Sequence, residues 1–141
     1  MLENRYSEGI LKEYKPLYYY CRDEINRPWV TVCLLWKMIS GAPVVFSRGV
    51  AICSNEDNIC KNWGRRLALE RAMLAAVTQY DTEEIDRSGT NGNIAHIYYS
   101  ILPFEFIFKS EYEPDLTIYE TKVIDRIALK YNWGCIWIIK N

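Results

Sequence analysis

Two consecutive runs of β-branched and aromatic residues constrain the fold of this chain more than any other feature. The runs are WVTVCLLWKM at 29–38 and VVFSRGVAIC at 44–53, and the glycine-containing stretch ISGAP links them. Such residues favour extended strands, and a short link with a glycine favours a turn between antiparallel strands. We therefore expect a β-hairpin over residues 29–53.

The hydrophobic pattern changes to that of a long helix over residues 55–80. At about 100° per residue, one strip of this helix carries only small side chains, and a wider arc carries bulky apolar ones. The small residues are Gly64, Ala68, Ala72 and Ala75. The bulky residues are Ile59, Trp63, Leu67, Met73, Leu74 and Val77. Because a strip without bulk lets another backbone come close, we expect it to lie on the sheet and the bulky arc to face the remaining core or a partner subunit.

The C-terminal part of the chain predicts a second, amphipathic helix. Pro114 and Asp115 are typical of a helix start. Apolar residues then recur at three- and four-residue intervals: Leu116, Tyr119, Val123, Ile127 and Tyr131. The run NWGCIWIIK at 132–140 favours a last strand, and residues 94–112 also have a strand-like composition.

The length of 141 residues suits a single domain spanning residues 1–141. We expect residues 1–28 to form an N-terminal arm with a short helix and an extended piece, and residues 29–141 to form the core. The fold class is α+β: an antiparallel or mixed β-sheet with a β-hairpin, a long central helix and a C-terminal amphipathic helix.

Composition excludes several classes of function. The 17 basic and 18 acidic residues leave a net charge of −1, which lacks the positive field that holds a nucleic acid polymer. No apolar run reaches the roughly 18 residues of a membrane span, and the N-terminus lacks a secretory pattern, so we expect a cytosolic protein. The single histidine, His96, and five cysteines without a C-x-x-C pair predict no metal centre, no cofactor and no catalytic set.

The candidate ligand-binding residues gather at the start of the long helix, in and after CSNEDNICKNWGRR. Ser54 and Asp57 fit a capping box, which accounts for them but leaves the neighbouring cations unexplained. Lys61 and Arg65 project together beside the small-residue strip, and Arg71 flanks its other edge. A guanidinium beside a surface that lets other atoms approach is a suitable seat for a phosphate or a planar ring. The alternative for each of these cations is an ordinary solvated or salt-bridged helix charge.

The run RGVAICSNEDNICKNWGRRLALERAMLA at 48–75 resembles a recurring pattern of small phage-encoded proteins: a strand, then A-x-C-S-x-x-D, then a helix with G-R-x-L-A-x-x-R-A. With the strand before it, the similarity covers residues 29–77 and is to the Thoeris anti-defence family of signalling-nucleotide sponges. The matching positions are Ser54, Asp57, Gly64, Arg65, Leu67, Ala68, Arg71 and Ala72. This chain departs from the pattern between Asp57 and Gly64, where the expected basic run is missing.

The resemblance implies a phage protein that acts in the host bacterial cytoplasm and is not an enzyme. It would bind the cyclic ADP-ribose isomer made by a TIR-domain sensor and withhold it from the effector without cleaving it. We expect a homodimer or higher homo-oligomer, with Asn91, Asn93 and Arg126 completing the pocket. Two other functions stay open: an inhibitor that binds a host protein complex through an aromatic surface, and a small nucleotide-processing enzyme with His96 as its base.

Overall fold

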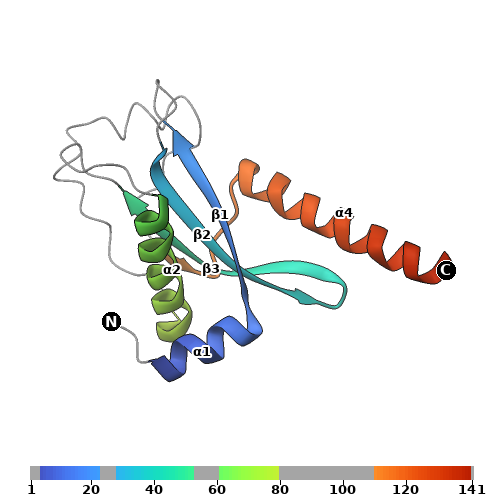
Figure 1. Ribbon diagram of the computed structural model, residues 1–141, viewed down its shortest axis with the longest axis horizontal. Coiled ribbons are helices and arrows are strands. Elements are labelled where there is room, and N and C mark those ends of the chain that lie inside the picture. The colour runs from blue at the N-terminus through green and yellow to red at the C-terminus, as the bar shows by residue number, and fades with distance from the viewer. Residues whose placement is uncertain (1–3, 23–27, 53–60, 80–109, 141) are drawn as a thin grey trace.

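The computed structural model describes the chain in four stretches: residues 4–22, 28–52, 61–79 and 110–140. Within them, a four-stranded antiparallel sheet carries a helix on each face (Figure 1). The strands, in sheet order, are β1 (Lys15–Arg22), β2 (Pro28–Ile39), β3 (Ala42–Ile52) and β4 (Glu111–Tyr112). The helices are α1 (Asn4–Glu13), α2 (Lys61–Thr78) and α4 (Ile118–Lys140). The predicted α+β class, with a hairpin, a long central helix and a C-terminal helix, is confirmed.

The hairpin of β2 and β3 closes through a two-residue turn. Ile39 pairs with Ala42, and the residues between them, Ser40 and Gly41, have φ angles of 52° and 82°. Two successive residues with positive φ give the type of turn whose twist matches that of a β-hairpin. Gly41 takes this conformation without the steric cost that a Cβ would bring.

Helix α2 lies directly on the sheet through its small residues, as the pattern predicts. Ala68, Ala72 and Ala75 are fully buried. A Cβ added to Gly49 of β3 would lie only 2.0 Å from the carbonyl oxygen of Ala68 and 2.3 Å from the nitrogen of Ala72. The helix backbone therefore approaches the strand backbone without side chains between them.

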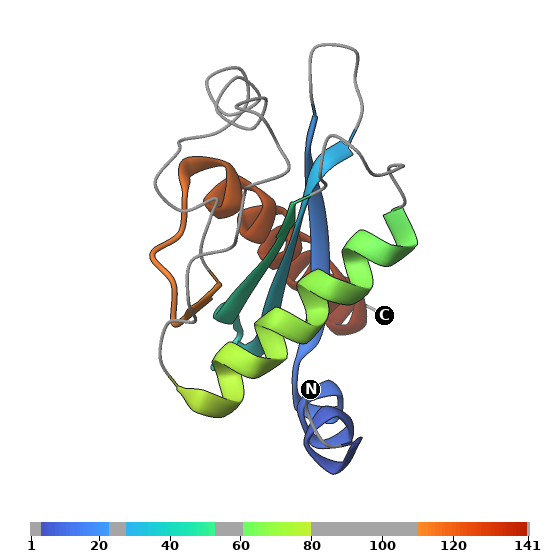
Figure 2. The ribbon, with the colours of Figure 1, turned by 90° about the vertical axis from the view of Figure 1, so that its left-hand side faces the viewer.

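The two long helices cover opposite faces of the sheet, with α2 in front of it and α4 behind it in Figure 2. Among the described helices, none is long and apolar enough to cross a bilayer. Both faces of the central strands bury apolar side chains: Cys33 and Leu35 pack on the α2 side, and Val32 and Leu34, which point the other way, are also fully buried.

The N-terminal segment contributes to the sheet. Strand β1 lies within the residues expected to form an arm, and it pairs with β2 from Lys15↔Trp36 to Cys21↔Val30. Just after α1, Tyr14 packs into the core against Phe46, with ring centroids 4.6 Å apart. Residues 15–21 are therefore part of the same layer as the hairpin.

The strand predicted at 132–140 is wrong, because α4 continues to Lys140. Isoleucine and tryptophan favour strands, but a short apolar run does not by itself distinguish a strand from a buried helical segment. In the sequence the three- and four-residue spacing of apolar positions continues through Tyr131, Cys135 and Ile138. That spacing is compatible with one uninterrupted helix. Most of the strand-like segment 94–112 lies outside the described residues, except that β4 occupies its end.

Candidate functional site

Arg65 lies at the edge of α2 that faces β1. Its guanidinium Nη2 donates a hydrogen bond to Oδ1 of Asn62, 2.5 Å away and one turn earlier in the helix. Its charge also acts on the hydroxyl of Tyr18 in β1. Burial, and to a lesser extent Cys33, raises the pKa of Tyr18 to about 12, and the positive charge of Arg65 opposes that rise. A half-buried arginine and a half-buried tyrosine therefore lie within electrostatic range of each other at this edge.

Arg71 lies at the other edge of α2, beside β3. Its Nη1 donates to the carbonyl oxygen of Val50 at 2.7 Å, and burial lowers its pKa, opposed by the nearby charge of Glu70. Arg65 and Arg71 are six residues apart, which is about 9 Å along a helix axis. The two arginines therefore face different strands and do not converge on one phosphate group.

The remaining predicted site residues are spread over the chain or lie outside the described part. Arg126 is exposed on α4, which covers the opposite face of the sheet from α2. Lys61 is the first residue of α2, and its side chain lies outside the described residues. Also outside are Ser54, Asp57, Asn91, Asn93 and His96.

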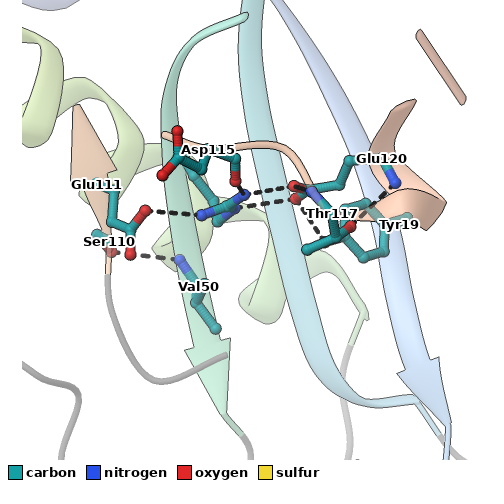
Figure 3. Close-up of polar contacts among 8 residues, drawn as sticks. Tyr19, Val50, Ser110, Glu111, Asp115, Thr117 and Glu120 are labelled. Atoms are coloured by element: carbon teal, nitrogen blue, oxygen red, sulfur yellow. Dashed lines mark hydrogen bonds and ion pairs between the residues drawn. The ribbon is translucent and has the colours of Figure 1, made fainter. Parts of the chain in front are cut away.

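A buried charge network on the α4 side of the sheet was not anticipated (Figure 3). Arg48 of β3 is fully buried, and its Nε donates to Oε2 of Glu120 at 2.9 Å while its Nη2 donates to Oε1. Its Nη1 donates to Glu111 of β4 at 2.9 Å, and Nη2 also donates to the carbonyl oxygen of Asp115 at 2.8 Å. One guanidinium thus contacts β4, the connection after it and the first turn of α4.

Glu120 is the carboxylate on which most of this network converges. It is fully buried, and Oε2 also accepts from the hydroxyl of Tyr19 in β1 at 2.7 Å. With Thr117 it forms a capping box: the Thr117 amide donates to Oε1, and the Glu120 amide donates to the Thr117 hydroxyl, both at 3.1 Å. Burial and Glu120 hold the pKa of Tyr19 well above its usual range, so the phenol stays a donor.

Two signals in the sequence could have located this network. Arg48 is a charged residue in a largely apolar strand, and a charged residue on a covered strand face needs a partner of opposite charge. The pattern T-x-x-E at 117–120 is that of a capping box just before an apolar period. Neither signal indicates that the two features meet.

The network holds the fold together and offers no reactive group. Among the described residues, every buried side-chain nitrogen or oxygen has a hydrogen-bond partner, and no cluster of metal-ligating side chains occurs. The chemistry that the α2 edge offers is different: a cation with a tyrosine hydroxyl within its electrostatic range, and such groups can hold an anion or a planar ring. Comparisons with known proteins identify no relative, because no protein-family model, curated protein or solved structure matches the chain.

Proposed function

We propose that the protein binds a cyclic ADP-ribose-isomer immune signal at the α2–β1 edge and sequesters it without cleavage. As a phage anti-defence protein in the host bacterial cytoplasm, it would keep this signal from the Thoeris effector. The proposal rests on the sequence resemblance over residues 29–77. The structural observation that supports it best is that the charge of Arg65 lies close enough to Tyr18 of β1 to act on its hydroxyl.

Arg65 has the properties that a phosphate-binding residue needs. Its hydrogen bond to Asn62 is to a neutral amide, which does not neutralise the guanidinium charge. A guanidinium can bind a phosphate through two parallel hydrogen bonds, and an aromatic ring at the same edge can contact a nucleobase. Sequestration requires affinity and no reaction, so it needs no catalytic set.

Calorimetric titration with purified cyclic ADP-ribose isomers tests the proposal. Arg65→Ala should weaken binding at least about tenfold, because a hydrogen bond to a charged group contributes about 1.5–3 kcal/mol. Lys122→Ala is the matched control, because Lys122 is an exposed cation on α4, on the other face of the sheet. Equal affinity of the Arg65→Ala variant and the wild type would remove this residue from the site.

The fate of the nucleotide separates a sponge from an enzyme. Heat denaturation of the complex should release the nucleotide intact, as read by chromatography and mass spectrometry. Recovery of a linear or otherwise cleaved product would replace the sponge with a nucleotide-processing enzyme.

A further inference from the structure

The face of α2 that points away from the sheet carries an apolar stripe that is interrupted by one acidic residue, Glu70. Trp63, Leu74 and Val77 are 63%, 43% and 38% exposed, and the half-buried Leu67 lies between them. With Glu70, these residues follow each other at alternating intervals of four and three, which is the spacing of a seam between two packed helices. Single exposed apolar residues are ordinary on a protein surface, but a run of them along one helix face is typical of an interface.

The charges on this face are self-complementary. Arg66 is exposed and Glu70 is half-buried, and they lie four residues apart along the stripe. If two α2 helices cross antiparallel about a twofold axis, Arg66 of each copy faces Glu70 of the other, so two opposite-charge pairs form. The same crossing places Trp63 of each copy near Leu74 of the other. A parallel arrangement would instead bring like charges together.

We propose that the outer face of α2 is a self-association surface, on which a second copy of this chain docks with its own α2 antiparallel. A twofold interface uses one patch on both subunits and therefore needs this kind of self-complementarity. Tryptophan is enriched among the residues that dominate interface energies, and Trp63 is the most exposed residue of the stripe. The inference does not depend on nucleotide binding, because Arg65 lies at the sheet side of the helix.

Sedimentation velocity over a range of concentrations tests the surface through a charge exchange. The wild type should sediment as a dimer, and Trp63→Ala should shift it towards the monomer. Arg66→Glu and Glu70→Arg should each weaken association about tenfold or more, because each creates two like-charge pairs. The double variant R66E/E70R should associate again. A mixture of the two single variants should form mixed dimers, because their charges become complementary between copies.

Lys122→Glu is the control for a charge reversal elsewhere on the surface and should leave association unchanged. Circular dichroism of each variant checks that a loss of association is not a loss of fold. A monomeric wild type, association that persists in Trp63→Ala, or mixed variants that stay monomeric would each overturn the inference. Nucleotide binding measured on the same samples reports on the proposed function separately.

Discussion

Replacing Glu120 by glutamine tests whether the buried carboxylate holds α4 to the sheet. Both carboxylate oxygens act only as acceptors: Oε1 from Arg48 and the Thr117 amide, Oε2 from Arg48 and Tyr19. A glutamine side chain has nearly the same shape but carries a donor in place of one oxygen. Whichever way the amide turns, its NH₂ group therefore faces two hydrogen-bond donors.

The size of the effect follows from these contacts. The variant loses at least one hydrogen bond to a charged group, about 1.5–3 kcal/mol, and leaves the Arg48 cation less compensated. Breaking a buried ion pair by removing one partner costs about 3–5 kcal/mol. Glu111 still contacts Arg48, so we expect about 3 kcal/mol. With a urea dependence of about 2 kcal/mol/M, the unfolding midpoint should fall by about 1.5 M.

Urea denaturation followed by far-ultraviolet circular dichroism measures this midpoint. Asp125→Asn on the same helix is the matched control, because Asp125 is exposed and the change removes the same charge. The control should lie within about 0.5 kcal/mol of the wild type. A Glu120→Gln midpoint equal to that of the control would refute the assignment of Glu120 as a structural clamp.

Three further predictions concern the glycines and the buried cysteines. Gly49→Ala should lower the free energy of unfolding by about 3 kcal/mol or more, because the added methyl group would overlap the backbone of Ala68. Gly9→Ala in α1 has open space around the added methyl group and should stabilise the protein by about 0.5–1 kcal/mol. Urea midpoints measure both changes. Cys21 and Cys33 are fully buried. In a variant whose other cysteines are replaced by serine, these two thiols should react with a thiol reagent only after denaturation. Fast labelling of the native state would contradict their placement. Burial, and after it the charge of Glu120, raises the pKa of Cys21 from 9.0 to about 12. The contribution of this protonated thiol to the free energy of unfolding is therefore fully present below pH 9.0 and is lost as the pH rises towards 12. Cys21→Ala should lessen the alkaline fall in stability, and an unchanged fall would exclude this thiol as a cause.

Local patterns predicted most of the described fold. The hairpin and the small strip of α2 depend on residue type and on periods of two or about 3.6 residues, which are visible within short windows. The Arg48–Glu120 pair spans 72 residues of sequence, so its formation depends on topology that no short window contains. The same limit applies to the site: helical projection places Arg65 and Arg71 on the flanks of α2. Only the sheet determines that one flank meets Tyr18 and the other meets Val50.

Neighbouring residues of β3 have opposite demands for space. Gly49 lies where α2 leaves no room for a methyl group, and Arg48 lies on the other side of the strand, where a full guanidinium finds two carboxylates. If the register of β3 shifted by one residue, Arg48 would point into the backbone of α2, and Gly49 in its place would leave Glu120 without its cation. Misaligned pairings of the hairpin are therefore penalised on both faces at once. The strand allows one alignment, and that alignment decides which helix covers which side of the sheet.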